Sequence, residues 1–202
     1  MLSLITFIAF LSVFSAASGI DEQCLADVVL DCIFSVGASD IIADRFDENE
    51  EMLDRKCEVM TKFEICVFDE AVVCPDISED MYYQFYKDQY IILSKVCNKG
   101  ADFRKKYLGN AKCLNKYMAQ VTEKCGGVLE VIEAAYSVTK ELCAKNKIAF
   151  ECTFEEYERN CGKESSAVIK ELLTGSISLT EKICSSFEPS DINTLRISLE
   201  MY

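Results

Sequence analysis

The sequence of 202 residues contains no histidine, and this absence excludes several kinds of active site. A chain without imidazole has no Ser-His-Asp or Cys-His nucleophile and no histidine-ligated zinc. It also lacks the commonest general base, which is histidine. Any catalysis would have to depend on carboxylates, tyrosines or lysines. An Asn-x-Ser/Thr sequon is also absent, so N-glycosylation is not expected. We therefore predict that the protein is not an enzyme, with no catalytic, cofactor-binding or metal-binding residues.

Long apolar runs are scarce too, and only the start of the chain contains one. Residues 1–20 carry no charged side chain, and an apolar run from Leu2 to Phe14 precedes small residues. This pattern is typical of a secretory signal peptide, with cleavage after Ser18 or Gly19. Because the usual basic start is missing, a retained anchor is the alternative, although the run is short for a bilayer crossing. We predict a signal peptide at 1–19 and a secreted, extracellular protein with no membrane span after cleavage.

Basic residues are outnumbered, and the formal net charge is −13. This excess of negative charge argues against nucleic acid and anionic membranes as partners. Residues 20–100 hold 19 acidic and 7 basic side chains, whereas residues 101–202 hold 15 and 14. The basic stretch from Arg104 to Lys116 is interpreted as a solvated linker. Alternatively, it contacts the acidic first half of its own chain or of another molecule, which would produce self-association.

Cysteine is what the sequence has in abundance. All twelve cysteines follow residue 20, and their even number in an oxidising compartment predicts a framework of up to six disulfides. A zinc site would need closely spaced ligand pairs, but the shortest interval between two cysteines is eight residues. We therefore interpret the cysteines as structural.

The cysteine spacing repeats along the chain. Positions 57, 66, 74 and 97 match positions 143, 152, 161 and 184 with offsets of 86 or 87 residues. The flanking sequences agree in places, as in CVFDE against CTFEE, whereas the two leading cysteines of each set match less well. We predict two tandem six-cysteine units. The predicted boundaries are 20–100 for the first unit, 101–112 for a basic linker, 113–190 for the second unit and 191–202 for a C-terminal tail.

Both units have a helical character. The chain contains only 2 prolines and 8 glycines, and alternation typical of strands is scarce. In the first unit we expect helices over 21–34, 47–74 and 79–97. In the second, after Gly126 and Gly127, we expect helical segments over 128–161 and 163–184, with an interruption near Gly175. The predicted fold is all-α: a disulfide-stapled helical bundle built from two three-helix units.

Helical phase indicates how the cysteines pair. At about 100° per residue, Cys57 and Cys66 point to opposite sides of their helix, whereas Cys66 and Cys74 share a side. Antiparallel helices bring together residues that are symmetric about the turn between them. Six cysteines still allow fifteen connectivities, and residues 137–138, the centre of two second-unit pairs, show no obvious turn. The predicted pairs are Cys57–Cys97, Cys24–Cys74, Cys32–Cys66, Cys143–Cys184, Cys113–Cys161 and Cys125–Cys152.

An aromatic run over residues 81–93 is the one candidate for a ligand site. Phe85, Tyr86 and Ile92 would line an apolar pocket between helices, and the protein would then be a carrier of an apolar small molecule. A partner-binding face is the second functional interpretation of this run. The alternative is a helix that buries Phe85 and Ile92 in the core and leaves part of the row of tyrosines on the surface.

Acidic residues cluster in three places. An EF-hand is excluded because Met81 and Lys87 occupy the sixth and twelfth positions counted from Asp76. Loosely bound cations and paired-carboxylate catalysis are the functional interpretations, and helix capping is the structural one. The clusters are Asp44, Asp47, Glu48, Glu50 and Glu51; Asp76, Glu79 and Asp80; and Glu155, Glu156 and Glu158.

Tandem units with the segments CLADVVLDC, CEVMTKFEICVFDE and CTFEEYERNC resemble the secreted cysteine-rich helical domains of unknown function found in nematodes and arthropods. The odorant-binding family is also helical, but its close Cys-x3-Cys pair is absent here. The resemblance implies a non-enzymatic extracellular protein. We expect it to act through its surface as a structural or protein-binding component of a body fluid, venom, silk or matrix, with a carrier as the alternative.

Overall fold

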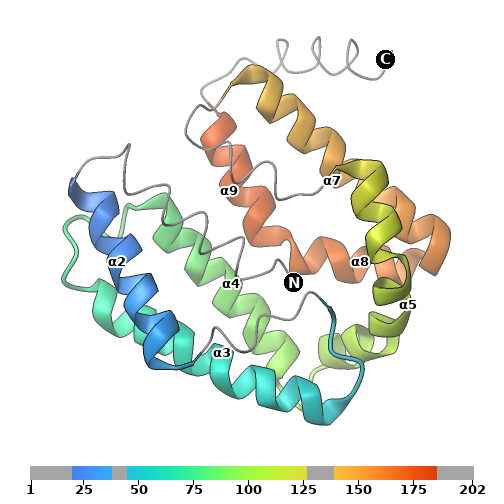
Figure 1. The fold of residues 1–202 in the computed structure, drawn as a ribbon, viewed down its shortest axis with the longest axis horizontal. Coiled ribbons are helices and arrows are strands. Elements are labelled where there is room, and N and C mark those ends of the chain that lie inside the picture. Colours follow the sequence, from blue (N-terminus) through green and yellow to red (C-terminus); the bar gives the residue numbers. More distant parts are fainter. Residues whose placement is uncertain (1–19, 38–44, 127–138, 186–202) are drawn as a thin grey trace.

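The computed structural model describes residues 20–37, 45–126 and 139–185, and the regular structure within these ranges is entirely helical, as predicted (Figure 1). The first half of the chain contributes a group of three helices, and the second half contributes the rest. The helices are α2 (Ile20–Ser35), α3 (Glu50–Ala71), α4 (Met81–Cys97), α5 (Asp102–Cys125), α7 (Lys140–Cys161), α8 (Lys163–Leu172) and α9 (Thr174–Cys184).

Local sequence signals determine where several helices begin and end. The Asn49 side chain accepts a hydrogen bond from the backbone N–H of Met52, and the Asp80 carboxylate accepts two from the start of α4. Such caps satisfy backbone donors that have no partner within the helix. At the other end, α5 and α7 stop at Gly126 and Gly162, whose positive φ angles favour glycine.

The interruption predicted near Gly175 lies at Leu173, between α8 and α9. Gly175 itself has a different role, because it is buried where α9 packs against α4. A Cβ atom at position 175 would lie 2.3 Å from Nε2 of Gln89. The missing side chain therefore lets the two helices approach each other closely.

Residues 101–112 form the first half of α5 and not the predicted linker. Arg104, Tyr107, Ala111 and Leu114 are all at most 1% exposed and follow the three- and four-residue spacing of a helix face. Four lysines lie exposed on the rest of the helix and conceal this pattern in the sequence: Lys105, Lys106, Lys112 and Lys116.

Every cysteine of the chain belongs to a disulfide, and each bridge joins two helices or a residue next to a helix end. The pairs are the six that symmetry about the turns predicts. Two bridges join α2 to α3 and one joins α3 to α4; likewise, two join α5 to α7 and one joins α7 to α9. They are Cys24–Cys74, Cys32–Cys66, Cys57–Cys97, Cys113–Cys161, Cys125–Cys152 and Cys143–Cys184.

The hydrophobic core crosses the predicted boundary between the two units. One cluster lies among α2, α3 and α4, around Val29 and Phe63. The other combines first-half residues such as Leu53 and Val96 with second-half residues such as Leu114 and Val168. The two halves therefore share buried surface, although no disulfide joins them.

Truncating Leu114 tests this sharing. We expect Leu114→Ala to cost about 2–5 kcal/mol, because it leaves a cavity at a fully buried position contacted by both halves. Denaturant unfolding followed by circular dichroism should still show one transition, shifted to lower denaturant. Ile91→Ala, at a side chain that is 52% exposed, is the control and should change little. Two separate transitions, of which only one moves, would contradict a shared core.

Candidate functional site

The predicted apolar pocket is not assembled in the structure. Tyr86 packs in the cluster of α2, α3 and α4, with its ring centroid 6.3 Å from that of Phe63. Ile92 packs in the other cluster, and Phe85 is only half-buried. Six residues of helix separate Tyr86 from Ile92 by about 240°, so the two side chains leave α4 in different directions. The three residues do not line a common site.

Most of the clustered carboxylates take part in structural contacts. Glu50 pairs with Arg104, Asp80 caps α4, and Glu156 pairs with Lys124 and Arg159. Asp44 lies outside the described residues. Within the described ranges, no group of three or more acidic or cysteine side chains is arranged to hold a metal ion.

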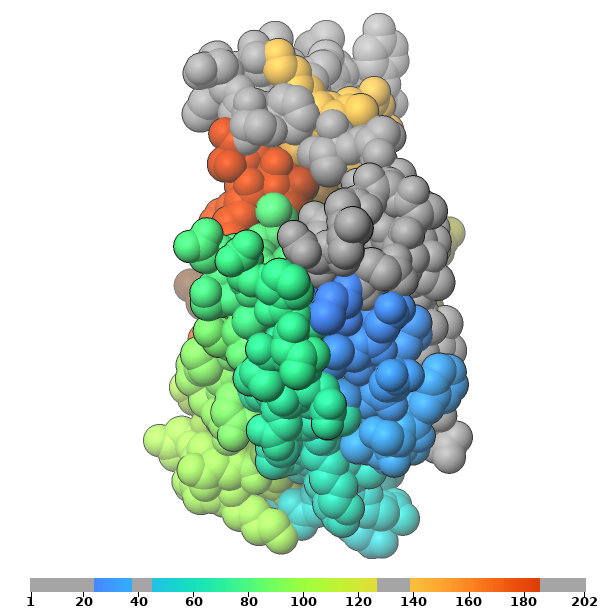
Figure 2. Space-filling model, turned by 90° about the vertical axis from the view of Figure 1, so that its left-hand side faces the viewer, coloured from blue at the N-terminus to red at the C-terminus, as the bar shows by residue number. Residues whose placement is uncertain are grey.

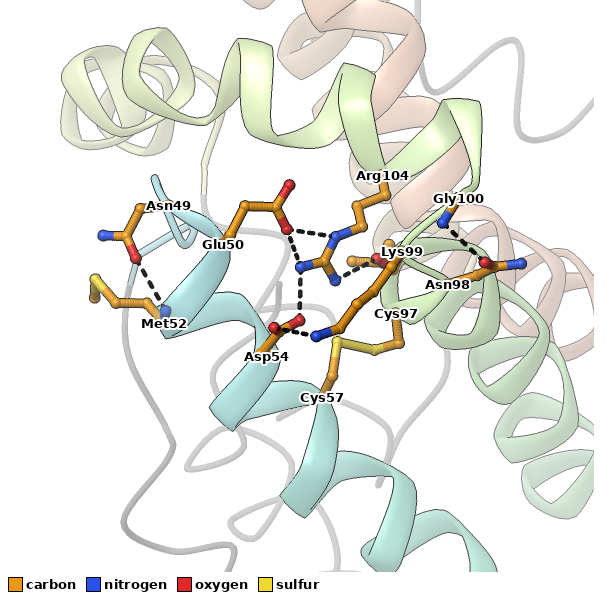
Figure 3. Close-up of polar contacts among 11 residues, drawn as sticks. Asn49, Glu50, Met52, Asp54, Cys57, Cys97, Asn98, Lys99, Gly100 and Arg104 are labelled. Carbon is orange, nitrogen blue, oxygen red and sulfur yellow. Dashed lines mark hydrogen bonds and ion pairs between the residues drawn. A yellow bond between two sulfur atoms is a disulfide. The ribbon is translucent and has the colours of Figure 1, made fainter.

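Arg104 is the centre of a polar contact between α5 and α3 (Figure 3). Its guanidinium donates to Glu50 and, at 2.7 Å, to Asp54, and it also donates to the carbonyl of Val96. Lys99 reaches Asp54 from the other side at 2.7 Å, and the two cations hold the pKa of that carboxyl below its usual value. The basic stretch thus contacts the acidic first half of its own chain, one of the predicted alternatives.

A second contact fixes the residues that precede α3 onto α5. The side chain of Asn115 donates to the carbonyl of Phe46 and accepts from its N–H, both at 2.8 Å. The backbone N–H of Asp47 donates to the hydroxyl of Tyr107, and the Asp47 carboxylate forms a buried ion pair with Lys56 at 3.3 Å. Burial raises the pKa of the Tyr107 hydroxyl, so it stays protonated at neutral pH. These groups serve folding, since they are enclosed between the two halves.

An apolar and aromatic surface runs along α3 and α4. Figure 2 shows this side of the molecule, with α3 at its centre between α2 and α4. The ring of Phe68 meets Tyr83 and Tyr90 edge to face, at centroid distances of 5.9 and 5.5 Å. Ile65 and Val72, one turn to either side of Phe68, are 48% and 68% exposed. We call these five residues the α3–α4 face.

A buried carboxyl group, that of Glu64, lies one helical turn before Phe68 on α3. The residue is 3% exposed, and its Oε2 atom has no hydrogen-bond partner among the described residues. Burial raises the pKa of Glu64 to about 8, so the group is mainly neutral at pH 7. Burial and the proximity of the Glu64 carboxyl raise the pKa of Tyr86 well above its usual value.

The sequence analysis named a partner-binding face on the aromatic run over residues 81–93, but it did not identify Glu64 or the α3 side of the α3–α4 face. A signal was present, because Glu64 lies four residues after Met60 and four before Phe68, on the side of α3 that also carries Val67. A charged residue in the apolar phase of a helix predicts either a buried partner or a functional group.

Comparison of the chain with models of protein families, with curated proteins and with solved structures finds no match. The resemblance to secreted cysteine-rich helical domains therefore stays a prediction. The six disulfides indicate a protein of the extracellular space or the secretory pathway. None of the helices in the described ranges combines the length and the apolar character needed to cross a membrane.

The role of Arg104 can be tested by truncation. We expect Arg104→Ala to destabilise the fold by about 1–3 kcal/mol, because it leaves the carbonyl of Val96 and the Glu50 carboxylate without their donor, and Asp54 with Lys99 alone. Lys105→Ala, at the neighbouring exposed position, should stay within about 0.5 kcal/mol of the wild type. Equal effects of the two substitutions in urea unfolding would show that Arg104 contributes no more than surface charge.

Glu64 gives the stability a specific dependence on pH. Between about pH 5 and pH 8, Glu64 keeps its proton in the folded protein but loses it on unfolding, because its pKa rises from 4.5 to about 8. The free energy of unfolding should therefore fall as the pH rises, by roughly 1.4 kcal/mol per unit from this group. Glu64→Gln should remove that slope, whereas Asp69→Asn, an exposed change of the same charge on α3, should keep it. Parallel pH profiles for wild type and Glu64→Gln would contradict the assignment.

Proposed function

We propose that the protein is secreted and acts without catalysis, binding an extracellular protein partner through its helical surface. The observation that carries this proposal is the use of all twelve cysteines in disulfides between helices. Disulfides of this kind form and persist in oxidising compartments, while cytosolic thiols stay reduced. The apolar, charge-free start of the chain supports entry into that pathway.

A binding role is favoured over a catalytic one by the chemistry of the polar residues. The chain has no histidine, and the buried ion pairs serve the fold: Arg104 holds α5 to α3, and Lys56 of α3 holds Asp47. The exposed residues of the α3–α4 face offer apolar surface to another molecule, as protein-binding surfaces commonly do. The protein would thus be a structural or binding component of an extracellular fluid or matrix.

The structure gives less support to self-association through the basic stretch than the sequence alone does. Arg104 is 1% exposed and is already paired with Glu50 and Asp54 of its own chain. The exposed lysines of α5 remain for contacts with a second molecule. Binding of a different protein is therefore the proposal that we develop further.

Expression of the full chain in a eukaryotic secretory cell line tests the proposal. The medium should contain protein that begins at Gly19 or Ile20 and is twelve hydrogens lighter than its fully reduced form. A version that starts with Met followed by residue 20, made in the cytosol, should be reduced and poorly folded, since it lacks the oxidising compartment. Retention in the cell with residues 1–19 attached, or hydrolase activity that acid-to-amide substitutions abolish, would overturn the proposal.

A further inference from the structure

The α3–α4 face has the shape that recognises an extended or helical protein segment. Ile65 and Phe68 of α3 and its C-cap residue Val72 are spaced i, i+3 and i+7 in helical conformation, which extends them over about 10 Å. Tyr83 and Tyr90 continue the apolar surface onto α4. This spacing matches the anchors by which one amphipathic helix packs on another.

The charge around the face is negative. Glu58 and Asp69 are exposed on the same side of α3 as Ile65, and the first half of the chain has the large acidic excess noted above. Two lysines nearby are already engaged: Lys62 pairs with Glu58 at 2.7 Å, and Lys87 lies over the ring of Tyr83 at 4.6 Å. The face thus complements a partner that is apolar and positively charged.

Glu64 is buried next to this surface, one turn before Phe68 on α3. The Cys57–Cys97 bridge fixes the level of the antiparallel helices α3 and α4. Glu64 lies seven residues after Cys57 on α3, and Tyr90 lies seven residues before Cys97 on α4. Because the two helices are antiparallel, Glu64 and Tyr90 lie at the same level. Glu64 also precedes Phe68 by one helical turn, and the Phe68 ring meets the ring of Tyr90, which is 38% exposed. The Oε2 atom of Glu64, which has no partner among the described residues, is available to a cation that passes Tyr90.

We propose that the α3–α4 face binds a cationic amphipathic segment of a partner protein, whose lysine or arginine passes Tyr90 and pairs with the carboxylate of Glu64. The apolar side chains of that segment would cover Ile65, Phe68 and Val72. This inference rests on the proposed protein-binding function and specifies its site and the chemistry of its partner. On binding, the carboxylic acid of Glu64 gives its proton to solvent, and the carboxylate forms an ion pair with the incoming cation.

This proton release makes the proposal measurable. The chain has no histidine, so no other side chain ordinarily titrates between pH 6 and pH 8. The Tyr86 hydroxyl of α4 interacts electrostatically with Glu64, and the described charged residues of α2, Asp27 and Asp31, are exposed. Burial alone accounts for the raised pKa of Glu64. Affinity for a cationic segment should therefore increase from pH 6 to about pH 8 and then level off.

The probe is a synthetic amphipathic peptide of leucine and lysine, tested by calorimetry against the oxidised, secreted protein. We expect binding with release of up to one proton at pH 7, measured in buffers of different ionisation enthalpy. Glu64→Gln should abolish the proton release and weaken binding about tenfold. Asp69→Asn removes the same charge from an exposed position of α3 and should weaken binding less than about threefold.

The apolar part of the face has its own matched pair of variants. Ile65→Ser combined with Val72→Ser should weaken binding of the peptide at least tenfold. Phe34→Ser, at a residue of α2 that is 71% exposed, should leave it unchanged. Circular dichroism and an unchanged oxidised mass confirm that each variant is folded, so a loss of affinity is not a loss of structure.

Three results would overturn the inference. One is equal binding of a leucine–glutamate peptide, and another is binding without proton release that Glu64→Gln leaves unaffected. The third is displacement of the peptide by butylamine at equal concentration, which would indicate a small-amine site. Each of these would leave secretion and disulfide formation intact, so the wider proposal would stand or fall separately.

Discussion

Covalent links between helices are the constraint on which the rest of this structure depends. Each half of the chain is about 80 residues, a size at which a hydrophobic core alone gives little net stability. Three disulfides in each half, at about 2–4 kcal/mol apiece, supply most of what such a core lacks. In each half, two bridges join the first pair of helices and one joins the next pair, so the middle helix cannot move away from either neighbour.

The two halves are held together without any covalent link. Helix α9 packs on α4, and α5 makes the rest of the connection: Tyr107, Ala111 and Leu114 enter the shared core, while Arg104 and Asn115 bind residues at or just before the start of α3. The polar contacts lie at the edge of the apolar ones. Apolar burial provides the stability, and the ion pairs and amide contacts determine how the halves are aligned.

A framework stabilised in this way can tolerate features that a marginal core could not. The buried carboxyl of Glu64, whose Oε2 atom has no hydrogen-bond partner among the described residues, costs free energy, and so does the exposed apolar surface beside it. Both lie on α3 and α4, which the Cys57–Cys97 bridge connects. These two unfavourable features occur together on a rigid pair of helices. For this reason we regard the α3–α4 face as a binding surface.

Local patterns in the sequence determined the helical fold class, most helix ends and the pairing of the cysteines. These features depend on helical phase, caps and the short turns between neighbouring helices, all of which involve residues close in the sequence. Tertiary structure alone decided that residues 102–112 are helical with one buried face, that Tyr86 and Ile92 belong to different clusters, and that Glu64 is enclosed. In each case the burial of a side chain depends on neighbours from distant segments, and the periodicity of a single helix carries no information about which neighbours cover which face.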